Sequence, residues 1–238
     1  MPITHIFFDL HGTLIDSECM LQNYRRGLGQ IMSTRYGQSP EVWEEADRRI
    51  VADWDSYFAD LNLSGDDVLR DLKEGWIRIT RALFRLAKVT EPQKDVISAL
   101  SLELPSTAPA YGDAIYEDAR IAVKQLHDEG YQLGVVTHAL EGQAKAALKG
   151  ANLLDCFTAP IVGMDTVEQF DKDRIFFIKT AHLAKVEPAQ CLVVDTSQEA
   201  LTGAKSAGMQ VIRLNRGAAT NDKIITNLNQ LLLLDGIR

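Results

Sequence analysis

The second half of the chain alternates short apolar runs with helix-length stretches, and no other feature constrains the fold as strongly. After residue 110, the apolar runs that predict strands span residues 133–136, 158–162, 191–194 and 210–214. The amphipathic or alanine-rich stretches that predict helices span residues 117–129, 141–149, 173–184 and 199–207. Strands that alternate with helices are typical of a parallel sheet with helices on both faces. The sequence therefore predicts a doubly wound α/β fold.

An acidic residue ends the first apolar run of the chain. Residues 3–8 contain no Asp, Glu, Lys or Arg and predict a strand covered on both faces, and Gly12 and Thr13 predict a turn soon after it. An ionised Asp9 at the end of a buried strand costs free energy unless a cation, hydrogen-bond donors or a reaction uses it. The alternative is that Asp9 caps the next helix through its side-chain oxygen.

Residues 17–100 differ from the rest of the chain because they contain no convincing strand. They carry amphipathic stretches such as that from Val68 to Leu86, which predict a helical module between the first and second strands. The segment 103–109 contains two prolines and is predicted to be the linker that returns the chain to the sheet. An insertion at this point lies over the carboxyl ends of the strands, where open α/β sheets bind ligands, so the module can serve as a cap. Three tryptophans at apolar positions of its helices are predicted to be core residues: Trp43, Trp54 and Trp76.

The segment from Asp9 to Asp16 reads DLHGTLID. It resembles the first motif of the haloacid dehalogenase-like (HAD) hydrolase superfamily, which Asp9, Gly12, Thr13 and Asp16 match. His11 stands where most phosphatases of that family have a second Asp. The resemblance implies a Rossmann-like core with strand order 5-4-1-2-3 and an inserted all-α cap, as in the helical-cap branch. The implied boundaries are residues 1–16 and 108–238 for the core and 17–107 for the cap.

Two further segments resemble the second and third motifs of the family. Thr137 ends an apolar strand, and the family uses a hydroxyl there to bind a phosphoryl oxygen; His138 follows where Asn is usual. Lys172 is the best match to the motif lysine, which neutralises the nucleophile and the bound phosphate, although the usual Pro is absent. Lys179 is the alternative. The structural interpretations, as alternatives to these roles, are that Thr137 caps a turn and that Lys172 is a solvated residue at the start of a helix.

The fourth motif is expected at the end of the fourth strand, where Asp195 lies. Many relatives have two adjacent acids there, but this chain has Thr196 next and Glu199 four residues after Asp195. Asp195 is also suited to cap the helix that follows. The resemblance implies a Mg²⁺ site formed by Asp9, Asp195 and the main-chain carbonyl of His11, with water as the remaining ligands.

The resemblance assigns a role to each of these residues. Asp9 would attack phosphorus and form an aspartyl phosphate, and His11 would be the acid and base. Thr137, His138 and Lys172 would bind the phosphate. An imidazolium beside Mg²⁺ is disfavoured, so a neutral His11 would be a better base than acid. The predicted strand order would put Asp9 between Thr137 and the acid of the fourth motif.

The leading functional prediction is a Mg²⁺-dependent phosphatase of a small phosphomonoester. Because relatives that replace the residue at His11 often catalyse other reactions, a metal-independent haloacid dehalogenase-like hydrolase is the first alternative. There Asp9 would attack carbon, and Arg25 or Arg26 could bind the halide. A ligand-binding or interaction protein, with a site impaired at His11 and Thr196, is the second alternative.

Composition limits the location and the partners. With 46% hydrophobic and 24% charged residues, the 238-residue chain is typical of soluble globular proteins. Its net charge of −8, without a long basic run, argues against nucleic-acid binding. It has no apolar run long enough to span a membrane and no signal-like start, so it is predicted to be cytoplasmic and not bound to a membrane. It is predicted to be a monomer or a homodimer. Cys19, Cys156 and Cys191 lack CxxC spacing, so neither a disulfide framework nor a thiolate zinc site is expected, and Cys191 is predicted to be a core residue.

Overall fold

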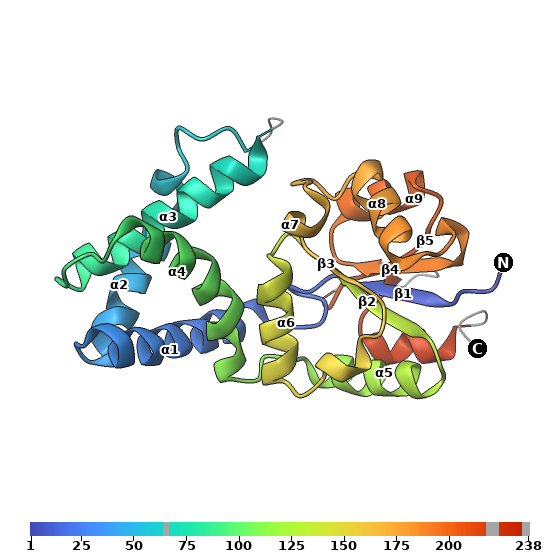
Figure 1. Cartoon of the computed structure of the whole chain (residues 1–238). Coiled ribbons are helices and arrows are strands. Elements are labelled where there is room, and N and C mark those ends of the chain that lie inside the picture. The colour runs from blue at the N-terminus through green and yellow to red at the C-terminus, as the bar shows by residue number, and fades with distance from the viewer. Residues whose placement is uncertain (64–66, 218–223, 235–238) are drawn as a thin grey trace.

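A parallel six-stranded sheet organises the part of the chain that contains the predicted strands (Figure 1). The computed structural model describes residues 1–63, 67–217 and 224–234. The strands are β1 (His5–Phe8), β2 (Gln132–Val136), β3 (Ile161–Val162), β4 (Cys191–Asp195), β5 (Gln210–Leu214) and β6 (Ile224–Ile225). Their order, β3-β2-β1-β4-β5-β6, confirms the predicted order of the first five strands. No strand was predicted after residue 214, so β6 was missed, and the strand predicted at residues 158–162 is shortened to the two residues of β3.

The central strands are buried on both faces, as expected for parallel sheets covered by helices. All five residues of β4 are buried, and Phe7 and Phe8 of β1 are fully buried although they point to opposite faces. Gly134 in the neighbouring β2 leaves room for Phe7, since a Cβ at Gly134 would lie 2.5 Å from the Phe7 ring. The apolar runs at β1 and β4 therefore correspond to strands with no solvent-facing side, whereas four of the five residues of β5 are exposed or half-buried.

Helices cover both faces of the sheet: α5 (Glu117–Asp128), α6 (Glu141–Gly150), α7 (Met164–Val167), α8 (Arg174–Ala184) and α9 (Gln198–Ser206). Apolar residues of α5 and α6 pack in one cluster with Phe8, and those of α8 and α9 pack in another with Phe7. In Figure 1, α8 and α9 lie above the sheet and α5 lies below it. The predicted α/β architecture is thus confirmed. The ends of its four predicted helices are correct to within one residue.

Four α-helices lie between β1 and α5 in the described part of the chain: α1 (Ser17–Tyr36), α2 (Pro40–Ala52), α3 (Val68–Leu86) and α4 (Lys94–Thr107). We call this segment the helical module. Its own hydrophobic cluster includes Leu28, Trp43 and Phe84, and Figure 1 shows it beside the sheet rather than on either face. No helix in the described parts of the chain combines the length and the apolar character needed to cross a membrane.

The prediction that residues 103–109 form a linker is wrong. Residues up to Thr107 continue α4, with Pro105 inside the helix, and a 3₁₀ turn follows at Ala108–Tyr111. Proline removes one helical hydrogen bond, yet Leu104 and Ala108 on either side are buried in the cluster of the helical module. Packing of these apolar side chains therefore outweighs the helix-breaking tendency of the proline.

Two short segments attach the helical module to the sheet. The Asp16 N–H donates to Ala114 O at 2.8 Å, and the Tyr116 N–H donates to Leu14 O at 3.0 Å. Asp16 also begins α1, because its Oδ1 accepts a hydrogen bond from the Cys19 N–H at 2.9 Å. These contacts hold the end of β1 and the start of the module close to residues 114–116, where the chain returns toward β2.

We predict that Cys191 is unreactive in the folded protein. It is fully buried at the start of β4, and burial raises the pKa of its thiol to about 12, so the reactive thiolate is scarce near neutral pH. Cys19 and Cys156 are only partly buried. Titration with a thiol reagent at pH 8 should modify Cys19 quickly and Cys156 more slowly, because burial raises the pKa of the Cys156 thiol as well, and Cys191 only after unfolding. A Cys191→Ser variant should give the same native count, and rapid modification of all three thiols would contradict the prediction.

Candidate active site

A buried lysine connects the carboxyl ends of three adjacent strands. The Nζ of Lys172 donates to Asp9 Oδ1 at 2.6 Å, to Asp195 Oδ2 at 2.8 Å and to the carbonyl of Val136 at 3.3 Å. Asp9 follows β1, Val136 ends β2 and Asp195 ends β4. Since β1 pairs with both β2 and β4, parallel pairing brings these ends to the same edge of the sheet. We call Asp9, Lys172 and Asp195 the strand-end cluster.

Burial and charge determine the protonation of the cluster. Lys172 is 5% exposed and Asp195 is 1% exposed. Burial alone would lower the pKa of Lys172, but the carboxylates of Asp9 and Asp195 more than offset this and raise it, so the ammonium stays charged. Burial and the negative charge of Asp9 raise the pKa of Asp195, against the opposing effect of Lys172. With both carboxylates ionised, one ammonium leaves the cluster with a net negative charge.

The other carboxylate oxygens of the cluster have weaker or neutral partners. Asp9 Oδ2 accepts from the hydroxyl of Thr13 at 3.2 Å, and Asp195 Oδ1 accepts from the Ser197 N–H at 2.8 Å. Neither aspartate caps the helix that follows it. Asp16 caps α1, and Ser197 caps α9 through its hydroxyl. The capping interpretation is therefore wrong for both Asp9 and Asp195.

His11 lies between the strand-end cluster and the helical module. Its Nδ1 is 3.4 Å from the hydroxyl of Ser17, the first residue of α1. Burial and the positive charge of Lys172 both lower the pKa of His11, so its imidazole is neutral near pH 7. Gly12 follows with φ +75°, a conformation that glycine adopts without strain and that turns the chain away from β1.

Thr137 and His138 follow β2 at the same edge. Thr137 is almost fully buried, and its hydroxyl oxygen accepts from the Ala139 N–H at 3.1 Å, so it does cap the turn as the structural interpretation predicted. Burial, followed by the charge of Lys172, lowers the pKa of His138. Its ring lies 6.0 Å from that of Phe170.

The remaining candidates lie outside the strand-end cluster. Lys179 donates to the carbonyl of Val167 at 2.6 Å, whereas Lys172 contacts both aspartates. Glu199 accepts from the hydroxyl of Ser197 at 2.9 Å and is exposed. The structure thus brings Lys172, and not Lys179, to the predicted site.

Arg216 is a residue of this region that the sequence analysis missed. Its Nε donates to Gly12 O at 3.3 Å and its Nη2 to Thr13 O at 2.8 Å, so it holds the turn after Asp9. Its Nη1 lies within 2.9 Å of both carboxylate oxygens of Asp118, and its guanidinium carbon is 3.8 Å from the centre of the Tyr116 ring. No motif marks a single arginine after β5, and its partners come from distant parts of the sequence.

A cavity of about 500 Å³ lies between the strand-end cluster and the helical module. His11 and His138 line one end, and Trp54, Trp76 and Leu83 belong to the module side. The prediction of a core position is confirmed for Trp43, which is fully buried, but wrong for Trp54, which is 44% exposed and faces the cavity. Helical periodicity predicts which side of a helix is apolar, but not whether a cavity adjoins that side.

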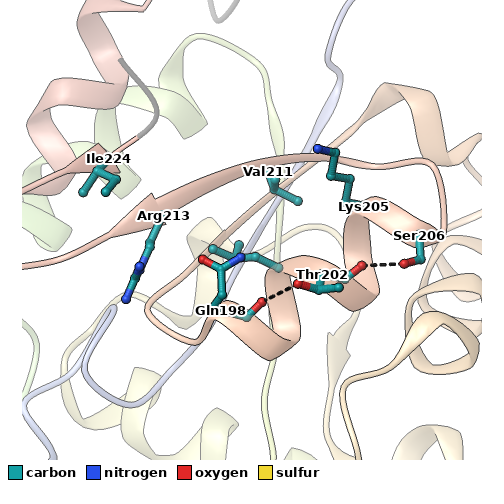
Figure 2. A pocket seen from close by; sticks show the side chains of 8 residues that line it. Gln198, Thr202, Lys205, Ser206, Val211, Arg213 and Ile224 are labelled. Carbon is teal, nitrogen blue, oxygen red and sulfur yellow. Dashed lines mark hydrogen bonds between the residues drawn. The ribbon is translucent and has the colours of Figure 1, made fainter. Parts of the chain in front are cut away.

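A second groove lies away from this cavity, between α9 and β5 (Figure 2). It has a volume of about 610 Å³ and includes Lys205 and Arg213. Two hydroxyls on its α9 side donate to the carbonyls one turn earlier: Thr202 to Gln198 at 2.8 Å and Ser206 to Thr202 at 2.6 Å. This groove contains neither His11 nor His138, which follow β1 and β2 beside the strand-end cluster and line the cavity, so the cavity is the candidate site.

We predict that Arg216→Lys destabilises the fold by about 1–3 kcal/mol, because an ammonium cannot replace the planar set of donors that joins Gly12, Thr13 and Asp118. Urea unfolding measures the loss. Arg213→Lys is the matched control, since the buried Nε of Arg213 has no hydrogen-bond partner among the described residues. Equal losses in both variants would show that the contacts of Arg216 do not stabilise the turn.

Comparison with known sequences identifies similar proteins. A phosphoglycolate phosphatase from Pseudomonas fluorescens is 27% identical over 238 residues, which cover 98% of this chain and 76% of the relative. A phosphoglycolate phosphatase from Rhodospirillum rubrum is 31% identical over 127 residues, 53% of this chain and 52% of the relative.

Solved structures show the same fold at lower sequence identity. A HAD phosphatase from Thermococcus onnurineus has a TM-score of 0.57 at 22% identity, with 97% of this chain and 96% of that chain covered. A 2-haloacid dehalogenase from Pseudomonas syringae has a TM-score of 0.60 at 21% identity, with 97% of both chains covered. The family model described as haloacid dehalogenase-like hydrolase matches residues 3–208, most of the chain. The chain therefore belongs to the haloacid dehalogenase-like hydrolase family.

Proposed function

We propose that the protein hydrolyses a small phosphomonoester through an aspartyl-phosphate intermediate on Asp9. The observation that carries this proposal is the contact of Lys172 with both Asp9 and Asp195 at the strand ends. A buried ammonium at this place can offset the charge of a nucleophilic carboxylate and of the phosphoryl oxygens that approach it. Family membership and the relatives named as phosphatases support the same reaction.

Asp9 acts as the nucleophile. Its Oδ1 is held by Lys172 at 2.6 Å, whereas its Oδ2 has the longer contact with Thr13, at 3.2 Å, and is the freer oxygen to attack phosphorus. Attack forms the bond between Asp9 and phosphorus and breaks the bond between phosphorus and the ester oxygen, which leaves as the alcohol after taking a proton. Water then attacks the aspartyl phosphate, releases phosphate and regenerates the carboxylate.

His11 is proposed as the proton carrier of the reaction. The lowered pKa favours a neutral imidazole, which can take a proton from the attacking water in the second step. The resulting imidazolium can return that proton to a leaving alcohol in the next cycle. Thr137, His138 and Lys172 are proposed to bind the phosphoryl oxygens, since all three lie at the end of β2 or contact it.

Mg²⁺ is the cofactor proposed for this site. No group of three or more His, Cys, Asp or Glu side chains suited to a metal ion occurs within residues 1–63, 67–217 and 224–234. Mg²⁺ is commonly held by only one or two carboxylates together with water and substrate oxygens, so Asp9, Asp195 and the His11 carbonyl meet its requirement for oxygen ligands. The net negative charge of the strand-end cluster favours a further cation. Bound Mg²⁺ would offset negative charge on the phosphoryl group.

We propose residues 17–107 as a cap domain and residues 1–16 and 108–238 as the core. The separate hydrophobic cluster of the helical module supports this division. Residues 218–223 and 235–238 of the proposed core lie outside the described residues. A cap at this position would close the cavity beside His11 over the substrate.

The dehalogenase alternative has less support. Arg25 Nε donates to Asp47 Oδ2 at 3.1 Å and does not line the cavity, and Arg26 is exposed. Neither arginine is therefore placed to bind a halide in the cavity. The likeness to solved dehalogenases concerns the fold, since the identities are below 25%.

We predict that the protein releases phosphate from a generic aryl phosphate with Mg²⁺ and that a chelator abolishes the release. Asp9→Asn should reduce kcat to background, because the amide is a poor nucleophile. Asp16→Asn is the matched control: asparagine caps a helix as well as aspartate does, so activity should remain close to that of the wild type. Turnover by Asp9→Asn equal to that of the wild type would exclude Asp9 as the nucleophile.

A second prediction concerns the substituted residue of the first motif. His11→Asp should preserve or raise kcat, because a carboxyl group at this position performs the same proton transfers in most phosphatases that this motif resembles. His11→Ala should lower kcat by about 10²–10⁴-fold, the usual effect of losing a general acid and base. If His11→Asp instead lost about 10²-fold or more, the imidazole would have a role that a carboxylate cannot fill.

A further inference from the structure

The cavity beside His11 is placed to hold the part of the substrate that leaves as the alcohol. His11 and His138 at one end join it to the strand-end cluster, and α2, α3 and α4 contribute to the other end. A third groove, of about 760 Å³, reaches Lys172. It is lined by charged residues that include Asp171, Arg174 and Glu199, and it contains neither His11 nor any residue of the helical module. The proton carrier of the proposed reaction therefore faces the cavity and not this groove.

Most of the cavity wall is apolar. Trp54, Trp76, Ile79, Leu83, Leu104 and Met164 contribute to it. The volume of about 500 Å³ lies within the range of pockets that hold small organic ligands, and exceeds what a two-carbon group needs. Tryptophan presents a large, flat surface with a high capacity for contact with another ring. These walls favour an aromatic or branched apolar group.

The charges of the wall oppose an anionic group. Asp47 lines the cavity, whereas no lysine or arginine occurs among the described residues of its lining. Arg25, which does not line the cavity, is bound to Asp47 at 3.1 Å. A carboxylate that enters such a space loses water without gaining a cationic partner, which is strongly unfavourable.

Two hydroxyls of the module that line the cavity, those of Thr80 and Ser101, act as hydrogen-bond acceptors toward a ligand. The Thr80 hydroxyl donates to the Trp76 carbonyl at 2.8 Å, and the Ser101 hydroxyl donates to the Ser98 carbonyl at 2.8 Å. Each hydroxyl has only one hydrogen, so its oxygen faces further partners as an acceptor. Acceptors stabilise neutral donors in a ligand and repel carboxylate oxygens.

We propose that this cavity selects a phosphomonoester whose alcohol portion is uncharged and aromatic or branched apolar, over one that carries a carboxylate, such as phosphoglycolate. The inference rests on the proposed phosphatase function and defines its substrate class. It separates this chain from the substrate that gives two of its relatives their names.

The test compares two esters that differ in one group: 2-phenylethyl phosphate and its para-carboxy derivative, with phosphoglycolate as a third substrate. Both phenylethyl esters have a primary alcohol as the leaving group, so a difference reports the cavity and not the intrinsic reactivity. We expect kcat/KM to be about 10-fold or more higher for the neutral ester. Equal values, or a preference for either carboxylate-bearing substrate, would overturn the inference.

A charge placed in the wall should reverse the selection. Trp54→Lys should raise kcat/KM for the para-carboxy ester relative to the neutral ester, because Trp54 is partly exposed and can be replaced without opening the core. Ile121→Lys is the matched control: Ile121 is 45% exposed on α5 and is absent from the cavity lining, so the ratio should remain that of the wild type. The same ratio in Trp54→Lys and Ile121→Lys would count against the cavity as the specificity site.

Binding to Asp9→Asn separates the inference from the proposed reaction. The fluorescence of Trp54 and Trp76 in this variant reports occupation of the cavity. The probes are the two phenylethyl esters and inorganic phosphate. Tighter binding of the neutral ester supports the inference even if no ester is hydrolysed by the wild type, in which case only the proposed function fails. Equal binding of the two esters, or binding of neither, overturns the inference.

Discussion

The contact of one ammonium with two buried carboxylates is the interaction on which the site depends. Asp9 and Asp195 end adjacent parallel strands, and without Lys172 their like charges would repel in a place that water barely reaches. The cluster can form only because β1 lies between β2 and β4. The order of the strands therefore determines whether the site can form, because another order would separate the groups that Lys172 contacts.

Two parts of the chain surround the strand-end cluster: the loops on the sheet side and the helical module. On the sheet side, Arg216 fixes the turn after Asp9, and the Ser197 N–H fixes Asp195. The opposite wall of the cavity belongs to the helical module, which has its own hydrophobic cluster and is attached through the segments at Asp16 and Tyr116. No side chain of the module belongs to the strand-end cluster, so the proposed reactivity and the proposed selectivity reside in different parts of the chain.

Sequence reasoning was accurate where a local pattern carries the information. Buried parallel strands appear as apolar runs, and Asp9 and Asp195 could be predicted because each stands at the end of such a run. Lys172 was proposed only through its resemblance to the third motif of the family. Arg216 could not be predicted, because its partners Gly12, Thr13 and Asp118 are about 100 or 200 positions away. The helical continuation through Pro105 and the exposure of Trp54 likewise depend on tertiary packing that local periodicity does not contain.

His11 and the cavity impose compatible demands on a substrate. In the proposed reaction His11 gives its proton to the departing alcohol and becomes a neutral imidazole, so it keeps no positive charge beside that group. The wall beyond it adds an acid and apolar surface but no lysine or arginine among the described lining residues. An anionic leaving group would therefore find its charge uncompensated both at the ester oxygen and deeper in the cavity. A neutral aromatic alcohol avoids that penalty and gains contact with the tryptophan rings. The substitution in the first motif thus fits a site in which apolar contact, and not added charge, distinguishes one phosphomonoester from another.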